Sequence, residues 1–343
     1  MAIPILGNSW ESFETMPREL ALQLAMMGTR FVRIFVFWDS CNPQKGVFDW
    51  TKTDADIDAV SNAKMQVYFN FYWCPEWACG GFKTYLPYTA GCSTLINGVL
   101  GFARNLDYCV NPPPIDPDAA FAFGKAAAER YGSKVDYWGV WNEPGGQNYW
   151  PRPDDPPSFF DVFARLVNQV VLPFTKGVRS VLPDAKFVGM EADSHGLVGD
   201  MLQAEKDTGV RLFDAIGIHT YPEGKLPDEV DDAFRRIDQD YLPIMKDLRG
   251  DREVWVTEMG FAGYPGDPYT QKVTRFINGL SDRGISRVSF HGVKQWFAPG
   301  VINDNTWLLA AGQAGYKPRS ATYTAVQRII IPERRHPNET TEA

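Results

Sequence analysis

The sequence lacks several features that define large classes of protein. No apolar run approaches the roughly 18 residues that span a bilayer, so we expect no membrane partner. No lysine and arginine cluster is interleaved with aromatic residues, and the formal net charge is −8, so we expect no nucleic-acid partner. Together these absences favour a soluble protein whose partner is neutral or basic.

Histidine is scarce, which bears on metal chemistry. The four histidines are scattered at His195, His219, His291 and His336, and no His-x-His pair lies on an early apolar run. Metal-dependent barrel hydrolases need such clusters, so we expect no catalytic metal and no other cofactor. The cysteines also lack metal-binding spacing, because they form no Cys-x-x-Cys pair and have no neighbouring histidine.

Cysteine is also sparse, but it is clustered. The five residues are Cys41, Cys74, Cys79, Cys92 and Cys109, and the last four fall within one loop-like stretch. This clustering favours one or two disulfides, with the pairing open, and implies an oxidising compartment. The chain begins without a basic or extended apolar leader. We therefore expect a secreted or otherwise extracytoplasmic protein whose signal peptide is not part of this sequence.

What the chain does have is enough apolar material for a large core. Of its 343 residues, 44% are hydrophobic and 14% aromatic, and the eleven tryptophans are many for this length. Most of them should pack in the core, while some offer flat faces suited to stacking on sugars. No linker divides the chain, so we expect one domain over residues 1–331 and a polar C-terminal tail over residues 332–343.

Short apolar, β-branched runs alternate with helical patterns, which predicts βαβ units and a parallel sheet. The eight predicted strands are Ile3 to Asn8, Phe31 to Phe37, Gln66 to Tyr72, Val135 to Trp141, Lys186 to Glu191, Ala215 to His219, Glu253 to Glu258, and Arg287 to His291. The predicted helices are Pro17 to Met27, Asp54 to Ala63, Asp116 to Tyr131, Ser158 to Val181, Leu197 to Thr208, Asp228 to Leu248, Tyr269 to Arg283, and Arg319 to Ile331. Pro173 should kink the fourth helix or end it early.

Eight strand-helix units predict an α/β fold with a single (β/α)8 TIM barrel. A doubly wound sheet is the alternative, but no glycine-rich phosphate loop follows the first strand. The longest loop runs from Trp73 to Ile115, after strand three, and contains the four clustered cysteines and several aromatic residues. We expect this long cysteine-containing loop to form an ordered wall beside the active site.

Two acids close apolar runs and so stand at the mouths of predicted strands. Glu143 follows the fourth strand in Trp141-Asn142-Glu143-Pro144, and Glu258 ends the seventh in Val254-Trp255-Val256-Thr257-Glu258. Cleavage of a glycosidic bond takes one carboxyl to protonate the leaving oxygen and another to attack or stabilise the oxocarbenium-like carbon. Because the loops after barrel strands build the active site, the pair predicts a glycosidase.

Other side chains at strand ends extend this pair. In strand order the set is Arg33, Trp38, Trp73, Asn142 with Glu143, Glu191, His219 with Tyr221, Glu258, and Trp296. The set resembles the clan A retaining glycoside hydrolases, TIM barrels whose acid/base follows strand four and whose nucleophile follows strand seven. The similarity is greatest to family 39, through residues 137–150 and 183–186, and then to families 5 and 42, through residues 32–50. Residues 69–72 depart from family 5, which usually carries a histidine there.

The resemblance implies a role for each residue. Glu258 would be the ionised nucleophile, and Glu143 would start protonated as acid and then act as base. Asn142 would bind the sugar 2-hydroxyl, Tyr221 would donate to Glu258, and Arg33 would lie beneath Glu258 and keep it anionic.

The remaining residues would contact the sugar. Trp296 would form the floor of the subsite for the cleaved sugar, and His219 would line the same pocket. Trp38 and Trp73 are further candidates for substrate contact, although packing explains them equally well.

The expected activity is hydrolysis of a β-type glycosidic bond, or its α-L-arabinofuranosidic equivalent, by a monomer that retains configuration. Two alternatives stay open: a transglycosylase on the same scaffold, and a catalytically inactive carbohydrate-binding barrel. The inactive barrel would lose one of the two carboxylates, whereas both are present here. The sugar is not specified, and a long disulfide-bonded loop that closes the groove into a pocket favours exo action.

Overall fold

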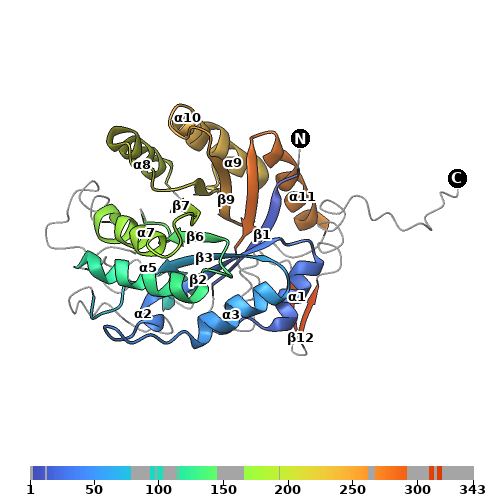
Figure 1. Cartoon of the computed structure of the whole chain (residues 1–343). Helices are drawn as coiled ribbons and strands as arrows, with labels where there is room; N and C mark the ends of the chain where they lie inside the picture. The colour runs from blue at the N-terminus through green and yellow to red at the C-terminus, as the bar shows by residue number, and fades with distance from the viewer. Residues whose placement is uncertain are drawn as a thin grey trace, which may run out of the picture.

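Eight parallel strands close into a barrel with helices outside it, as Figure 1 shows for this computed structural model. The described residues are 3–11, 14–78, 93–96, 99–102, 114, 116–144, 166–192, 194–261, 267–291, 309–312 and 315–318. Around the barrel the strand order is β1-β10-β9-β8-β7-β6-β3-β2. The predicted (β/α)8 TIM barrel is therefore confirmed, while the predicted tail over residues 332–343 lies outside the described residues.

The barrel strands coincide with the predicted ones, and their ends differ by at most two residues. Their bounds are β1 (Ile5–Trp10), β2 (Phe31–Phe37), β3 (Gln66–Tyr72), β6 (Tyr137–Val140), β7 (Phe187–Ala192), β8 (Ala215–His219), β9 (Glu253–Met259) and β10 (Ile285–Phe290). Nearly every residue of β2, β3 and β9 is buried, because helices cover one face and the barrel interior covers the other. This two-sided burial explains why the strands read as continuous apolar runs.

Two short antiparallel hairpins were not predicted. One joins β4 (Ser93–Ile96) to β5 (Val99–Phe102), within the predicted long loop, and the other joins β11 (Leu309–Gly312) to β12 (Gly315–Pro318). Most of the predicted long loop from Trp73 to Ile115 lies outside the described residues.

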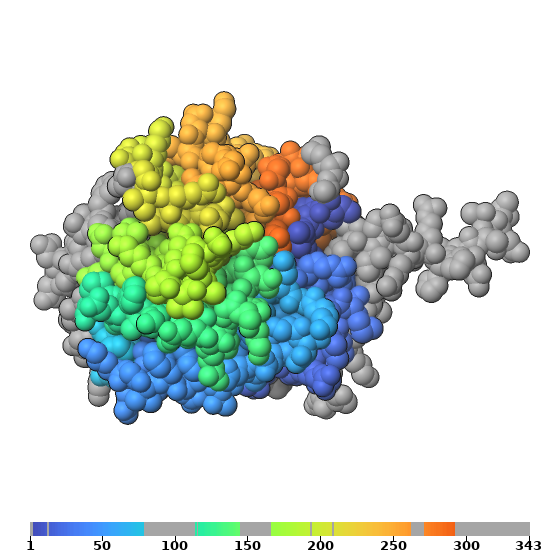
Figure 2. Space-filling view, viewed as in Figure 1, coloured from blue at the N-terminus to red at the C-terminus, as the bar shows by residue number. Residues whose placement is uncertain are grey.

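Most of the predicted helices are present and begin within three residues of their predicted starts, whereas the helix Trp38–Cys41 was not predicted and the predicted start at Ser158 lies outside the described residues. Their bounds are α1 (Arg18–Met26), α2 (Trp38–Cys41), α3 (Thr51–Asn62), α5 (Pro117–Tyr131), α7 (Leu172–Arg179), α8 (His195–Thr208), α9 (Glu229–Arg235), α10 (Leu242–Met245) and α11 (Asp267–Ser281). The Asp116 side chain accepts from the backbone N–H of Asp118 at the start of α5. Figure 2 shows α3, α5, α7 and α8 side by side around the barrel. The predicted helix Arg319 to Ile331 lies outside the described residues.

Proline disturbs two helices in the same way. Pro173 is the second residue of α7 and follows the π-helical turn η2 (Val167–Val171), and Pro243 in α10 follows the π-helical turn η3 (Arg236–Tyr241). Proline has no N–H, and its ring crowds the carbonyl four residues earlier, which a wider π turn accommodates. The kink expected at Pro173 therefore takes the form of a π turn, and the helix continues to Arg179.

One of the five cysteines is set apart from the others. Cys41 is a free, buried thiol whose Sγ lies 3.2 Å from Thr53 Oγ1, and burial raises its pKa to about 12. Cys74 is buried just after β3, while Cys79, Cys92 and Cys109 lie outside the described residues. The expectation of one or two disulfides among the clustered cysteines therefore stays a prediction.

Aromatic rings and one arginine fill the end of the barrel where the strands begin. Trp255 lies 5.9 Å from Phe31 and 4.8 Å from Tyr137, measured between ring centroids. The Arg287 guanidinium lies 4.6 Å from the Trp255 ring centroid and donates to the Tyr137 hydroxyl at 2.8 Å. Gly7 leaves space for this plug, because a Cβ there would lie 2.2 Å from the Phe31 ring. The plug closes the barrel from below.

Replacing the arginine should destabilise the barrel. We expect Arg287→Ala to lower the free energy of unfolding by about 2 to 4 kcal/mol, because it removes a partly desolvated cation–π contact and two hydrogen bonds. Urea denaturation followed by circular dichroism measures the change. The matched control is Lys125→Ala in the exposed Lys125–Glu129 pair, which should change stability by less than about 0.5 kcal/mol. Equal effects of the two substitutions would contradict the structural role of the plug.

Candidate active site

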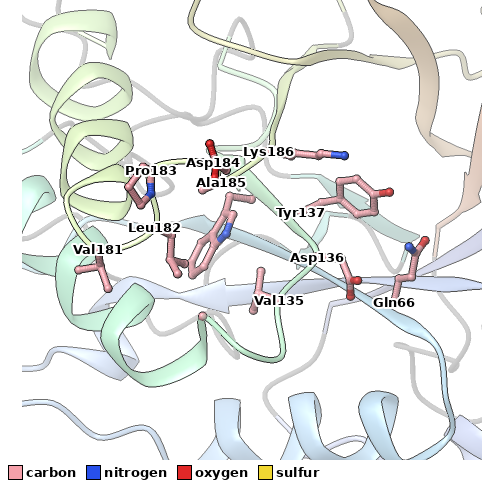
Figure 3. Close-up of a pocket in the computed structure, with 12 residues that line it drawn as sticks. Gln66, Val135, Asp136, Tyr137, Val181, Leu182, Pro183, Asp184, Ala185 and Lys186 are labelled. Atoms are coloured by element: carbon pink, nitrogen blue, oxygen red, sulfur yellow. The ribbon is translucent and has the colours of Figure 1, made fainter.

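The two ends of the barrel differ in what they offer a ligand. A hollow of about 460 Å³ opens where β3, β6 and β7 begin, and Figure 3 shows Gln66, Tyr137 and Lys186 around it. Active sites of TIM barrels lie at the opposite end, where the strands finish. At that end the predicted acids Glu143 and Glu258 come together.

Glu258, near the end of β9, is buried and held by two donors. Arg33 Nη1 donates to its Oε2 at 2.9 Å, and the Tyr221 hydroxyl donates to its Oε1 at 2.9 Å. Burial opposes ionisation, but the charges of His291, His219 and Arg33 outweigh it and hold the pKa of Glu258 well below its usual range. Glu258 is therefore a fixed carboxylate, as an attacking group requires.

Glu143 follows β6 and is more open to solvent than Glu258. Its side chain is 25% exposed, against 7% for Glu258. Its backbone N–H donates to the carbonyl of Glu191 at 2.8 Å, and its Oε1 lies 2.7 Å from His219 Nδ1. One oxygen of Glu143 and one of Glu258 lie within 4.8 Å of each other. Glu143 therefore stands at the open side of the pair.

His219, the last residue of β8, is completely buried behind the carboxylates. Its Nδ1 contacts Glu143, and its Nε2 lies 3.3 Å from Glu191 Oε2. Burial alone would lower the pKa of His219, but the carboxylates of Glu258, Glu143 and Glu191 raise it to about 10. His219 thus contacts Glu143 from the buried side, and its expected place in the sugar pocket stays a prediction.

Arg33 also fixes Asn142, the residue predicted to bind the sugar 2-hydroxyl. Its Nη2 donates to Asn142 Oδ1 at 2.5 Å, so the Asn142 amide has a fixed orientation. With that oxygen engaged, the Asn142 amide N–H2 is the group left to bind substrate. Arg33 is fully buried and so cannot itself contact a sugar.

The predicted tryptophans separate into three cases. Trp38 is fully buried, and its ring stacks on Phe123 with centroids 5.2 Å apart. The structure therefore places it in the core, and its expected contact with substrate is corrected. Trp73 is partly exposed at the end of β3, with its ring centroid 5.3 Å from that of Phe37. Trp296 lies outside the described residues.

Sequence reasoning missed a second group of ionisable side chains beside Glu258. Glu11 directly follows β1, and its carboxylate accepts from the Tyr72 hydroxyl at 2.5 Å. His291, just after β10, bridges the two acids, with its Nε2 3.4 Å from Glu11 and its Nδ1 3.5 Å from Glu258. Burial raises the pKa of Glu11. Inspection of the first strand's end would have found Glu11.

Backbone strain gathers at the same end of the barrel. Trp73, Trp141, Glu143 and Glu191 all have positive φ angles, of 70°, 70°, 43° and 58°. Residues other than glycine rarely adopt this conformation, which costs of order 1 to 3 kcal/mol each and is concentrated at functional sites. The strained residues follow β3 and β6 or, for Glu191, lie near the end of β7.

The same carboxylates could be considered as metal ligands. Glu143, His219 and Glu258 each place one ligand atom within 4.8 Å of the others. However, both ring nitrogens of His219 already face carboxylates, and the Arg33 guanidinium binds Glu258. The positive charge that these acids require is thus supplied by side chains, so we assign no metal to the site.

The buried histidine should make stability depend on pH. Since the pKa of His219 is raised from about 6.5 to about 10, the folded protein holds a proton between these values that the unfolded chain releases. We therefore expect the melting temperature to fall as the pH rises from 7 to 10. His219→Asn, which cannot titrate, should show a smaller slope in the same calorimetric series. Identical slopes for the two proteins would contradict a protonated His219.

Comparison with known proteins shows similarity in fold. No family model matches the sequence, and no curated protein matches it. Among solved structures, a family 39 glycoside hydrolase from the gut symbiont Bacteroides cellulosilyticus superposes with a TM-score of 0.62 at 15% identity. The match covers 97% of this chain and 64% of that one, so this chain spans less than two thirds of its length.

Two further structures have the same architecture. A family 39 β-xylosidase from Caulobacter crescentus matches with a TM-score of 0.65 at 16% identity, covering 96% of this chain and 72% of that one. A psychrophilic family 10 endo-β-1,4-xylanase matches with a TM-score of 0.60 at 15% identity, covering 95% and 96% of the two chains. The chain thus has the barrel fold of the clan A glycoside hydrolases that the sequence resembles.

Proposed function

We propose that the protein is a retaining glycoside hydrolase with Glu258 as nucleophile and Glu143 as acid/base. The observation that carries the proposal is the approach of the two carboxylates, which place one oxygen each within 4.8 Å. Retaining enzymes hold their carboxyl groups about 5 to 5.5 Å apart, whereas inverting enzymes need about 6.5 to 9.5 Å to admit water. The different surroundings of the two acids support their different roles.

The reaction would proceed in two displacements. In the first, the Glu258 carboxylate attacks the anomeric carbon while the proton of Glu143 passes to the glycosidic oxygen. The bond between the anomeric carbon and the glycosidic oxygen breaks. This leaves a glycosyl ester on Glu258 and a carboxylate on Glu143. In the second, Glu143 takes a proton from water, the water oxygen attacks the anomeric carbon, and Glu258 is released. Two inversions give net retention.

The neighbouring side chains support these steps. Tyr221 and Arg33 each bind one oxygen of Glu258 and hold it in line for attack. His219 contacts Glu143 and stabilises its anionic form after the proton has left. The Asn142 amide would bind the sugar 2-hydroxyl, where a hydrogen bond strengthens as the oxocarbenium-like transition state forms.

The substrate class we propose is a β-linked oligo- or polysaccharide. Several solved structures of the same fold are described as β-xylosidases or xylanases, so aryl β-xylosides and xylan are the first substrates to assay. Aryl β-glucosides, aryl β-galactosides and α-L-arabinofuranosides complete the panel.

We also propose an extracytoplasmic location, supported by the cysteines clustered in the long loop. Among the described residues, no helix is long and apolar enough to cross a membrane.

Removing either carboxylate should abolish most turnover. We expect Glu258→Gln and Glu143→Gln each to lose at least about a thousandfold in kcat on the best aryl glycoside. Azide should restore part of the activity of Glu143→Gln on an activated substrate, because a small anion can attack the glycosyl ester without a base, and should not help Glu258→Gln. The control Glu253→Gln alters an exposed acid at the opposite end of β9 and should keep wild-type turnover. Near-normal turnover in either site variant would sink the assignment.

A transglycosylase would share the covalent intermediate and differ in what resolves it. We expect water to react with the glycosyl ester faster than a sugar acceptor does, so most of the product should be free sugar with the acceptor at about 10 mM. Early NMR spectra should show this sugar in the anomeric configuration of the substrate. Transfer to the acceptor as the main product would instead identify a transglycosylase. First-formed product of inverted configuration would contradict both.

A further inference from the structure

Glu191 is a completely buried acid at the end of β7 that the proposed reaction does not use directly. Arg33 Nη2 lies 2.7 Å from its Oε2, His219 Nε2 lies 3.3 Å from the same oxygen, and the Tyr68 hydroxyl donates to its Oε1. Burial would raise the pKa of Glu191, but Arg33 and His219 hold it below its usual range. A carboxylate without solvent persists only when cations and donors surround it, as here.

Its two cations each contact a different catalytic acid. Arg33 binds Glu258 at 2.9 Å, and His219 lies 2.7 Å from Glu143 through its other ring nitrogen. In addition, the Glu191 carbonyl accepts the backbone N–H of Glu143 at 2.8 Å. Glu191 thus lies against both of the cations that hold the two catalytic acids, one of which, His219, also lies 3.8 Å from Glu258.

The barrel interior leaves space for this acid at two glycines. A Cβ on Gly217 in β8 would lie 2.8 Å from Glu191 Oε1, and a Cβ on Gly139 in β6 would lie 2.7 Å from the Tyr68 hydroxyl. Real Cβ atoms do not approach this closely, so any other residue would displace the acid or its donor. The glycines in β8 and β6 therefore leave room for the Glu191 carboxylate and for its donor Tyr68.

The charges around Glu191 suggest what its carboxylate does. Arg33 and His219 carry two positive charges, and Glu258 and Glu191 carry two negative ones. Glu191 thus offsets one of the two positive charges that lie against the catalytic acids. In the proposed first step Glu258 loses its charge in the glycosyl ester and Glu143 becomes a carboxylate. Without the negative charge at residue 191, the surplus positive charge beside Glu143 would favour loss of that proton before substrate binds.

We propose that Glu191 is a positioning residue that balances Arg33 and His219 and thereby keeps Glu143 able to donate its proton; this rests on the proposed function. Protonation matters most when the leaving group is a poor one, since an activated leaving group departs without it. A defect in the acid should therefore depend on the leaving group, whereas a general loss of structure should lower both rates alike.

The test compares two aryl glycosides of the same sugar, one with 2,4-dinitrophenolate and one with unsubstituted phenolate as leaving group. For Glu191→Gln, we expect kcat to fall about a hundredfold on the phenyl glycoside and less than about tenfold on the dinitrophenyl glycoside, with little change in KM. Glu191→Asp keeps the charge and should keep the wild-type ratio of the two rates. Equal losses on both substrates, or turnover within twofold of wild type on both, would overturn the proposal.

A matched control separates burial from function. Glu205, in α8, is also a buried acid paired with an arginine, Arg252, but it lies outside the site. Glu205→Gln should lower the melting temperature and leave the leaving-group ratio unchanged. If Glu191→Gln does not fold, Glu191→Asp decides, because it keeps the charge. A leaving-group ratio that departs from the wild type in Glu191→Asp would overturn the proposal, and a wild-type ratio supports it.

The two proposals fail in different ways. A folded wild-type protein that cleaves none of the panel of glycosides contradicts the proposed hydrolase. A wild-type protein that cleaves both test substrates, together with a Glu191→Gln variant that does so in the wild-type ratio, contradicts only the positioning role.

Discussion

Two buried cations surrounded by three acids determine the arrangement of the whole site. Arg33 and His219 are fully buried, and a barrel interior tolerates them only because carboxylates compensate their charge. The same contacts fix the direction of each acid, so the compensation of charge and the geometry of the acids have the same origin. The ionised state of Glu258 and its orientation therefore have a common cause.

The polar cluster depends in turn on the aromatic plug beneath it. Tyr68 belongs to both, because its ring packs 6.2 Å from that of Trp255 and its hydroxyl binds Glu191. Glycines at inward-facing positions provide the space that large rings and buried charges require. The barrel interior thus holds aromatic rings and Arg287 where the strands begin and the cluster of acids, Arg33 and His219 where they finish.

The fold could be predicted from the sequence because both faces of each strand are buried, which leaves continuous apolar runs between helical patterns. Glu143 and Glu258 could be predicted because the strand ends of a barrel converge. The resemblance also implied the contacts of Tyr221 and Arg33 with Glu258, which are present. The contacts of His219, Glu191 and Glu11 could not be predicted, since a strand end gives position along the axis but not the direction of a side chain. Trp38 turned into the core, and His219 lies behind Glu143, because packing of neighbouring helices and charges decides these directions.

The closed lower end of the barrel has a consequence for the order of events. Among the described residues, Arg287 and the rings of Phe31 and Trp255 fill the end where the strands begin, and Glu143 is more exposed than Glu258. In the proposed reaction the departing alcohol would leave on the side of Glu143, and water would enter on the same side. Water could then attack only after the alcohol had left, so the order of exit and entry would follow from the position of one side chain.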